Sequence, residues 1–258
     1  MNPLSLNWCR LKKLARVSAA IAYAKSMGIS REPCPLYVDI GARGGLPKHW
    51  SLVERARVIE PVFFEPDPEE APRIKQRFPR SIVLPYALGS AECEETLNIT
   101  REPGRSSILI PDHDFLDQYG GQPWTIERKV KIQINRMDRV WPIHFKRPPS
   151  FVKVDVQGYE LEVLRGMGAM LSEVQCIEHE TAYRPLYLKQ PVFGEIYSFL
   201  CDQGFDLVKT SPLGLYNGAV MEFNAFWVRR DTHDSALTRF WKMINNVADH
   251  DHIVAYGY

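Results

Sequence analysis

The sequence has none of the features that mark a membrane-spanning, disulfide-stapled or nucleic-acid-binding chain. No apolar run approaches the ~20 residues that a membrane-spanning helix needs. A net charge of +1 over 258 residues gives no reason to expect nucleic acid or an anionic membrane as the main partner. Internal repeats and low-complexity segments are absent as well. With 45% hydrophobic and 24% charged residues, the composition is typical of a soluble globular protein of one large or two small domains.

Cysteines are few, and their spacing forms no metal or disulfide pattern. The chain has five, an odd number, and none lies in a Cys-x-x-Cys motif: Cys9, Cys34, Cys93, Cys176 and Cys201. This argues against a zinc site and predicts a reducing, cytoplasmic location. Two clusters of His and Asp, residues 112–114 and 250–252, are interpreted as polar surface segments, so no metal is predicted.

The N-terminal segment, residues 1–34, combines basic residues with a weak apolar run at 17–24. The alanines and serine of that run are atypical of a secretory leader. Apolar and small residues recur at helical spacing, with basic residues on the other face: Leu11, Leu14, Ala15, Ser18, Ile21 and Ala22. We expect an amphipathic helical extension whose apolar face packs on the domain; a membrane-surface role is the less favoured alternative.

From residue 35 to residue 230, strand-like apolar runs alternate with helical patterns. Strands are predicted at residues 36–40, 61–65, 81–88, 151–155, 174–178, 205–209 and 223–228, and helices at 67–78, 158–170 and 191–201. A last helix, residues 234–247, is predicted within the C-terminal segment 231–258. This alternation predicts an α/β fold with a doubly wound, mainly parallel sheet covered on both faces.

Residues 89–150 depart from that alternation. Three of their segments alternate like half-exposed strands: residues 95–100, 105–110 and 130–135. We interpret the region as an antiparallel insertion between the third and fourth strands, within the same domain.

Acidic residues lie at the ends of four predicted strands: Asp39, Glu65, Asp155 and Glu178. In open α/β sheets the ligand binds beyond the carboxyl ends of the strands, so these acids describe one cleft. The first strand runs into a glycine loop, where Gly41 allows a tight turn close to a ligand. Glu65 follows about twenty residues after the glycines and can accept both hydroxyls of a ribose. The sequence therefore predicts a nucleoside-containing cofactor.

Two cofactor classes compete for this loop. A dinucleotide site favours G-x-G-x-x-G, whereas this loop reads G-x-x-G-G with Asp39 two residues ahead of it. A carboxylate is unfavourable beside a pyrophosphate but suits the amino group and sulfonium of S-adenosylmethionine. In addition, no tyrosine is followed four residues later by a lysine. An NAD(P)-dependent oxidoreductase is therefore the less favoured alternative.

An ordered set of motifs resembles the FkbM-type S-adenosylmethionine-dependent methyltransferases. These motifs are VDIGARGG at 38–45, FFEP at 63–66, PYALG at 85–89, KVDVQGYELEVLRG at 153–166, IE at 177–178 and FNAF at 223–226. The first is generic for class I methyltransferases and the fourth is much more specific; the similarity covers roughly residues 35–228. It implies a seven-stranded Rossmann-like sheet and O-methylation of a hydroxyl on a sugar, polyketide or related metabolite. Arg43 and Gln157 depart from the family's usual Asn and Glu.

The resemblance also implies a role for each matched residue. Cofactor-binding residues would be Asp39, Gly41, Ala42 and Gly45 at the methionine end, Glu65 and Pro66 at the ribose, Ala87 and Leu88 at the adenine edge, and Asp155 nearest the methyl group.

The proton acceptor is left open between several groups. The following helix points its positive end at Asp155 and lowers its basicity, so Asp155 is predicted to orient the acceptor. His179 titrates nearer neutrality and, with Glu178, is a candidate base; a hydrogen-bonded structural histidine is an equal interpretation. Gln157 cannot take a proton, and Glu160 is interpreted as structural because its charge favours the helix dipole.

The predicted partner is a small-molecule or glycan hydroxyl acceptor. Its specificity is expected in the insertion, where Ser106 and Ser107 are candidates to face it, and in the N-terminal helix. No nucleic acid and no transmembrane segment are predicted, and a homo-oligomer is compatible with the sequence. A cofactor-binding protein without activity is a third alternative.

Overall fold

A seven-stranded sheet forms the centre of the molecule. The computed structural model describes the backbone of residues 3–216 and 219–252 and the side chains of residues 11–214 and 221–246. The sheet order is β3-β2-β1-β7-β8-β12-β9. Its strands are β1 (Leu36–Ile40), β2 (Glu60–Phe64), β3 (Ile82–Leu84), β7 (Phe151–Val154), β8 (Cys176–Ala182), β9 (Phe205–Thr210) and β12 (Glu222–Arg229). The first five in this order are parallel, and β12 is antiparallel to both of its neighbours. The predicted mainly parallel, seven-stranded sheet is confirmed.

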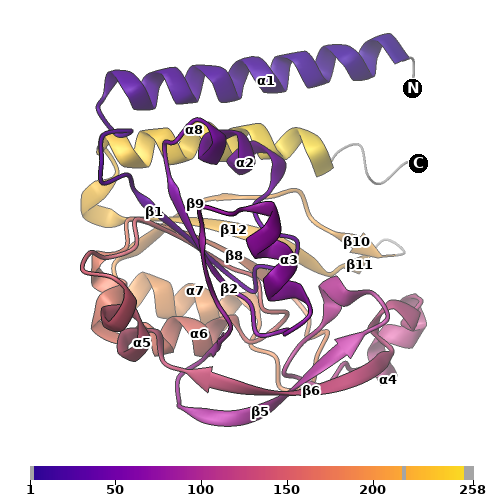
Figure 1. The fold of residues 1–258 in the computed structure, drawn as a ribbon. Helices are drawn as coiled ribbons and strands as arrows, with labels where there is room; N and C mark the ends of the chain where they lie inside the picture. Colours follow the sequence, from indigo (N-terminus) through magenta and orange to yellow (C-terminus); the bar gives the residue numbers. More distant parts are fainter. Residues whose placement is uncertain (1–2, 217–218, 253–258) are drawn as a thin grey trace.

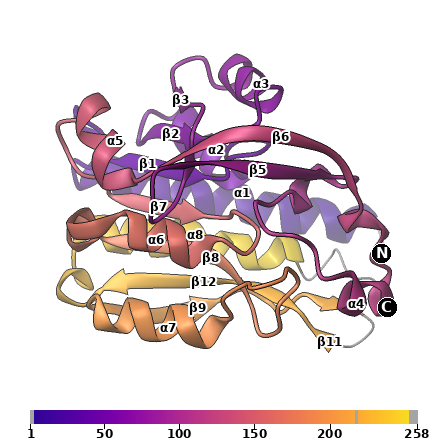
Figure 2. The same cartoon turned by 90° about the horizontal axis from the view of Figure 1, so that it is seen from below.

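Helices cover both faces of this sheet, which is why the central strands are apolar on both sides (Figures 1 and 2). On one face, α2 (Lys48–Arg55) and α8 (Ala236–His252) bury Trp50, Phe240 and Trp241. On the other face lie α5 (Met137–His144), α6 (Glu160–Gly166) and α7 (Phe193–Asp202). The short helix α3 (Glu70–Arg77) packs beside β3. The predicted helix 158–170 ends at Gly166 and continues as a 3-10 helix, Gly168–Glu173.

The N-terminal helix α1 (Pro3–Ser26) lies outside α8 and α2 and adds a further layer (Figure 1). It packs through Val17, Ala20 and Ala24, which are fully buried. Of the face that the sequence predicted to pack, Ile21 is partly buried against the core, but the two leucines are not: Leu11 is 62% and Leu14 44% exposed. Small alanines, rather than leucines, face the domain because they let α1 approach α8 closely.

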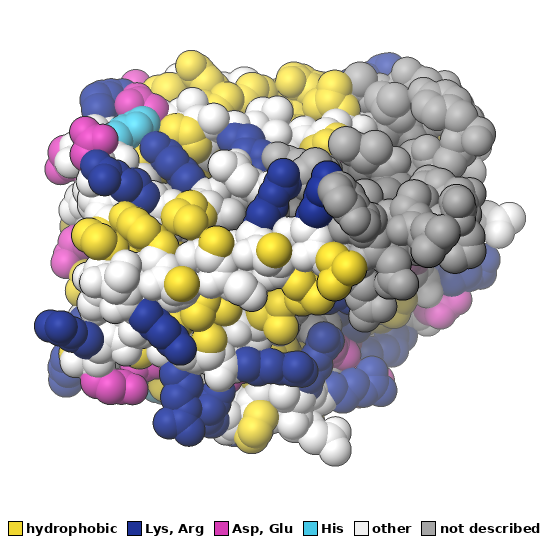
Figure 3. Space-filling model, turned by 90° about the horizontal axis from the view of Figure 1, so that it is seen from above, with side chains coloured by type: hydrophobic (Ala, Val, Ile, Leu, Met, Phe, Trp, Pro, Cys, Tyr) yellow, Lys and Arg dark blue, Asp and Glu magenta, His cyan; other side chains and the backbone are white. Residues whose placement is uncertain are grey.

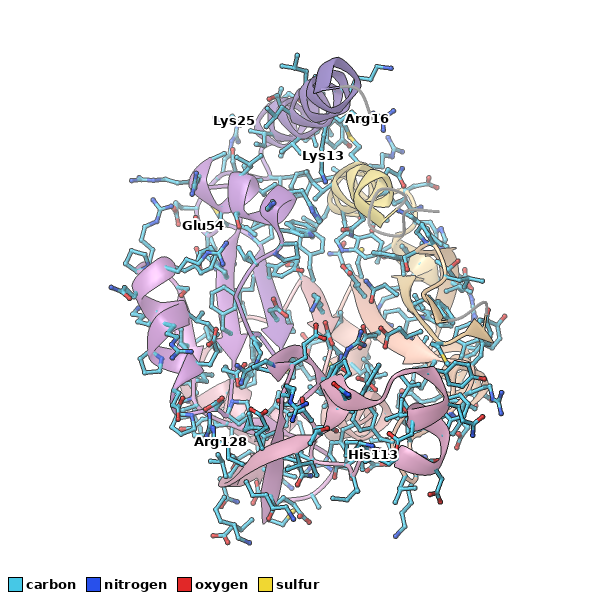
Figure 4. All side chains as sticks on the ribbon, turned by 90° about the vertical axis from the view of Figure 1, so that its right-hand side faces the viewer. Lys13, Arg16, Lys25, Glu54, His113 and Arg128 are labelled. Atoms are coloured by element: carbon cyan, nitrogen blue, oxygen red, sulfur yellow. The ribbon has the colours of Figure 1, made fainter. Side chains whose placement is uncertain are left out.

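The exposed face of α1 therefore remains apolar and basic. Figure 3 looks onto it and shows apolar side chains between Lys and Arg side chains. Figure 4 looks along α1 and shows Lys13 on the side of the domain, with Arg16 and Lys25 away from it. Burial and the neighbouring Lys48 lower the pKa of Lys13. Within the described residues, no helix is long and apolar enough to cross a membrane.

The insertion forms a second, smaller sheet at the carboxyl end of the central one (Figure 2). Its strands, in the order β4-β6-β5, are β4 (Ala87–Leu88), β6 (Ile126–Asn135) and β5 (Cys93–Thr100). β5 and β6 are antiparallel, as predicted, while β4 is parallel to β6. The predicted strand 81–88 divides at Pro85, which has no N–H to continue a ladder.

The third predicted strand of the insertion is wrong. Residues 105–110 form one isolated bridge, Asn98 to Ser107, after a 3-10 turn at Pro103–Arg105. The side chain of Asn98 takes the place of a neighbouring strand, because its amide donates hydrogen bonds to the carbonyl oxygens of Ser107, Ile108 and Leu109. The remaining short elements are α4 (His113–Leu116), β10 (Leu215–Tyr216) and β11 (Ala219–Val220).

Candidate functional site

A cleft lies at the carboxyl ends of β1, β2 and β7, between the central sheet and the insertion. It encloses about 830 Å³, the open solvent at its mouth included. Six of the predicted site residues line it: Gly41, Glu65, Pro66, Ala87, Leu88 and Asp155. The insertion contributes a largely apolar wall: Leu97, Pro103, Gly104, Ser106 and Ile108. Tyr86 and Tyr159 also line the cleft.

Gly41 is required where β1 and β7 end side by side. Its φ is +78°, and a Cβ there would lie 2.0 Å from the carbonyl oxygen of Asp155. No other residue fits this approach, so the glycine brings the loop onto the cleft floor.

Ala42 and Gly45, predicted to contact the cofactor, pack against the protein interior. Ala42 is 1% exposed, and its N–H donates to the carbonyl of Phe64. A Cβ on Gly45 would lie 2.3 Å from the ring of Phe78. Both residues therefore shape the glycine loop through their packing on the core.

Glu65 ends β2 with its carboxyl group in the cleft. The side chain is 3% exposed, and its Oε1 accepts the N–H of Asp67 at 2.9 Å. Among the described residues nothing donates to its second oxygen, so a ligand hydroxyl fits there. Burial raises the pKa of Glu65 to about 7, against the opposing effects of the Asp67 N–H and Arg43.

Arg43, the departure in the glycine loop, is held by buried acids next to Glu65. Its guanidinium contacts Asp67 at 2.5 Å and Glu70 at 3.8 Å. Arg128, which reaches from β6 of the insertion, binds the same Asp67 at 3.1 Å (Figure 4). The loop and the insertion are therefore joined through one carboxylate at this side of the cleft.

Lys153 lines the floor of the cleft and lies between acids of three strands. Its ammonium is 3.0 Å from Asp155 and 3.5 Å from Asp39. Burial alone would raise the pKa of Asp155, but Lys153 and the Gln157 amide lower it below its ordinary value. Asp155 is therefore ionised, and its side chain is 30% exposed.

Asp39 and Glu178 complete this cluster but do not line the cleft. Burial raises the pKa of Asp39 to about 6 and that of Glu178 to about 7, while Lys153 opposes both shifts. Asp39 is 1% exposed. Asp39 contacts Lys153 at 3.5 Å, and its contact with the cofactor stays a prediction.

His179 lies on the opposite face of β8 and does not reach the cleft. The ring is fully buried, stacks against Trp227 at 6.1 Å, and its Nδ1 lies 3.0 Å from the carbonyl of Glu180. Burial lowers the pKa of His179 to about 4. This placement contradicts its predicted role as base and agrees with the structural alternative.

Glu160 accepts the N–H groups of Val156 and Gly158 at 3.1 and 3.0 Å, which agrees with its interpretation as structural. Ser106 lines the cleft, whereas Ser107 is buried and donates to the carbonyl of Gln157 at 2.7 Å. In the cluster at 112–114, Asp112 caps α4 by accepting the N–H of Phe115. The cluster at 250–252 lies outside the described side chains.

Sequence reasoning missed Lys153 and Glu180 as members of the site. Both follow the two-residue period of a strand: Lys153 stands two residues before Asp155, and Glu180 two residues after Glu178. A charged residue on the same strand face as a candidate acid could therefore have identified both residues from the sequence.

Comparisons with known proteins agree with this architecture. A family model described as the methyltransferase FkbM domain matches residues 39–207, about two thirds of the chain. No curated protein matches the chain.

Similar solved structures are distant. The magnesium protoporphyrin IX methyltransferase of Synechocystis PCC 6803 with bound SAM is 14% identical, with 83% of this chain and 77% of that chain covered at a TM-score of 0.40. A TehB-like SAM-dependent methyltransferase from Corynebacterium glutamicum ATCC 13032 Kitasato is 11% identical, with 88% and 100% covered at 0.40. The 1,6-didemethyltoxoflavin-N1-methyltransferase of Burkholderia thailandensis is 10% identical, with 82% and 78% covered at 0.39. These likenesses say nothing about the acceptor of this chain.

Proposed function

The chain belongs to the FkbM methyltransferase family, and from this premise we propose that it methylates a hydroxyl group of a sugar, polyketide or related metabolite. Its cofactor is S-adenosylmethionine, and the family match removes the oxidoreductase alternative. The observation that supports a hydroxyl acceptor best is the Asp155 carboxylate, which is ionised by Lys153 and exposed at the cleft floor.

The residues of the cleft fit the cofactor. Glu65 offers an unpaired carboxylate oxygen for the ribose hydroxyls, with Pro66 beside it. Ala87 and Leu88 form an apolar surface for the adenine edge, and Gly41 leaves room at the methionine end. Asp39 would support the methionine end together with Lys153, which contacts it and lines the cleft. When bound, S-adenosylmethionine supplies an electrophilic methyl group.

Asp155 then orients the acceptor and receives its proton. An ionised carboxylate accepts the hydrogen bond of a hydroxyl and aligns its oxygen for in-line displacement, where alignment contributes most. Its low pKa makes it a weak base towards a free alcohol. The hydroxyl becomes strongly acidic as its oxygen forms the new bond to carbon, so a weak base is sufficient at that stage. Neither His179 nor Glu178 is needed for this step.

Replacing Asp155 tests this assignment. In Asp155→Asn, release of S-adenosylhomocysteine should fall about a hundredfold, since general bases typically contribute 10²–10⁴-fold. Calorimetric affinity for S-adenosylhomocysteine should change less than about threefold. Asp206→Asn, an exposed aspartate on β9 paired with Arg230, is the matched control and should retain full turnover.

The acceptor class is tested separately, with a panel of hydroxylated sugars and polyketide-like alcohols beside matched amines and thiols. Methylation confined to amines or thiols would overturn the proposed O-methylation. Tight binding of S-adenosylhomocysteine with no turnover on any compound would favour the cofactor-binding protein without activity. Tight NAD binding without a response to S-adenosylhomocysteine would contradict the cofactor assignment.

A further inference from the structure

Gln157 lies in the cleft with an unusual backbone. It follows Asp155 by two residues, is 7% exposed and has a φ of +56°. A non-glycine residue in this left-handed region costs about 1–2 kcal/mol, so the surrounding structure has to hold it there. Ser107 of the insertion does so by donating its hydroxyl to the Gln157 carbonyl at 2.7 Å.

The side-chain amide of Gln157 is surrounded by three polar groups. Its Nε2 donates to Asp155 Oδ1 at 3.0 Å and also to Glu180 Oε2. Its Oε1 accepts the hydroxyl of Tyr187 at 3.0 Å. Two acceptors and one donor match the two N–H bonds and the carbonyl of one amide. Turning the amide over would place its oxygen against two carboxyl oxygens, so this orientation is the one that the site selects.

The protonation of Glu180 affects the charge of the carboxyl groups around Gln157. Burial and the nearby Asp155, Glu222 and Glu160 raise the pKa of Glu180 well above its ordinary value, with Arg105 opposing. This shift favours the protonated form of Glu180, and a hydrogen bond from Glu180 also favours the ionised Asp155. The charged and titratable groups facing Asp155 include Lys153 from β7, Tyr37 and Asp39 from β1, Glu178 and Glu180 from β8, and Glu160 from α6.

Tyr187 extends the arrangement to the wall of the cleft. Its single O–H proton is shared between Gln157 Oε1, at 3.0 Å, and the carbonyl oxygen of Arg105, at 2.8 Å. Arg105 ends the turn whose Pro103 and Gly104 line the cleft. The Arg105 guanidinium binds the Glu222 carboxylate of β12 with contacts of 2.6 and 2.8 Å. The amide of Gln157 therefore connects Asp155, at the floor of the cleft, with the Pro103–Arg105 turn in its wall.

We propose that Gln157 is a positioning residue, whose amide fixes the Asp155 carboxylate in its acceptor-binding orientation and ties it, through Tyr187, to the Pro103–Arg105 turn of the insertion. The inference rests on the proposed function of Asp155 and adds how that carboxylate is held. It also explains an amide at this position, because a protonated glutamate has one O–H donor and cannot serve both Asp155 and Glu180. An ionised glutamate would add a further negative charge beside them.

The test measures the titration of Asp155 in the full chain, which needs no acceptor. Aspartate side-chain carboxyls are labelled with ¹³C, and the Asp155→Asn spectrum assigns the signal. In Gln157→Met, which keeps length but removes the hydrogen bonds, the Asp155 titration should move up by about one to two pH units, the effect of losing one hydrogen bond to a charged group. Gln157→Glu should move it in the same direction and serves if the methionine variant does not fold.

Turnover provides the second measurement, with whichever acceptor the panel identifies. Gln157→Met should lower kcat about ten- to hundredfold and change the KM for S-adenosylmethionine less than about threefold. Gln175→Met is the matched control: this glutamine is partly buried and accepts the hydroxyl of Ser235 at 3.1 Å, but it precedes β8 and contacts none of the groups around Asp155. It should lower stability without moving the Asp155 titration.

An unchanged Asp155 titration in both Gln157 variants would overturn the positioning role, whatever the activity. A shifted titration supports it even if no hydroxylated acceptor is methylated, which would count against the proposed O-methylation alone. A shift of equal size in Gln175→Met would also overturn it, since a glutamine outside this arrangement would then act alike.

Discussion

At the residue scale, Glu65 shows how burial can set the pH range of cofactor binding. Its carboxyl group is almost inaccessible and has a pKa raised to about 7 by that burial. The ionised form accepts hydroxyl hydrogen bonds more strongly than the acid, so a ligand that donates two hydroxyls favours deprotonation. Binding should therefore release a proton from Glu65 at pH values below about 7.

We predict that the affinity for S-adenosylhomocysteine rises as the pH increases from 5.5 towards 7 and levels off above about 7.5. Glu65→Gln should weaken binding about ten- to hundredfold at pH 8 and flatten this dependence. Calorimetry across pH 5.5–8.5 measures both effects. Glu60→Gln, at the other end of β2 and 46% exposed, is the control. A wild-type affinity independent of pH would contradict the assignment of Glu65.

Neighbouring residues on one strand show what alternation does and does not predict. Glu178 and His179 were both candidate bases, yet adjacent strand residues point to opposite faces of a sheet. Glu178 faces Lys153, while His179 enters the apolar core beside Trp227. The sequence was sufficient to recognise β8 as a strand. Which of its two faces carries the site depended on how the helices pack on each side of the sheet.

At the scale of elements, α1 illustrates a helix whose buried face is narrow. Val17, Ala20 and Ala24 contact the domain, while Leu11 and Leu14 remain in solvent. Hydrophobicity alone favoured the leucines. The buried face is centred on Val17, Ala20 and Ala24 because α1 contacts α8 along that side, with Ile21 partly buried at its edge.

This packing predicts unequal costs for substitutions in α1. The double change Leu11→Ser with Leu14→Ser should alter the free energy of unfolding by less than about 0.5 kcal/mol, as expected at exposed positions. Val17→Ser should lower it by about 2 kcal/mol, because it removes buried apolar surface and buries a hydroxyl. Urea denaturation of the full chain compares the two. A larger loss in the leucine variant would mean that the predicted face packs after all.

At the scale of the whole molecule, the buried acids around the cleft make folding depend on pH. The pKa values of Glu65, Glu160 and Glu178 are raised to about 7, chiefly by burial. The folded chain then holds protons that the unfolded chain has already released above about pH 4.5. Their stabilising effect is complete at low pH and is lost as the pH rises through about 7.

Two buried histidines make the stability of the folded chain depend on pH in the opposite sense, and mainly at lower pH. Burial lowers the pKa of His49 and His179 to about 4, so their contribution changes only below about pH 6.5. Between pH 6.5 and 8 we therefore predict that the cofactor-free chain loses stability, on the order of 2 kcal/mol for the three glutamates together. Chemical denaturation at both pH values measures it. Equal or greater stability at pH 8 would show that these acids are ionised in the folded chain at pH 6.5.

The sequence by itself determined the seven strands of the central sheet and the helices at 67–78, 158–170 and 191–201, though not α5 or the third strand expected in the insertion. It also determined the glycine turn at Gly41 and the position of Glu65 and Asp155 at the ends of their strands. These features follow from local patterns: burial of consecutive strand residues, the two-residue and 3.6-residue periods, and the freedom of glycine. Only the tertiary structure decided which groups meet. Gln157 and Tyr187 are thirty residues apart, and Arg105 and Glu222 are separated by 117. Such pairings depend on the packing of the insertion over the sheet, a distant contact that no local pattern encodes.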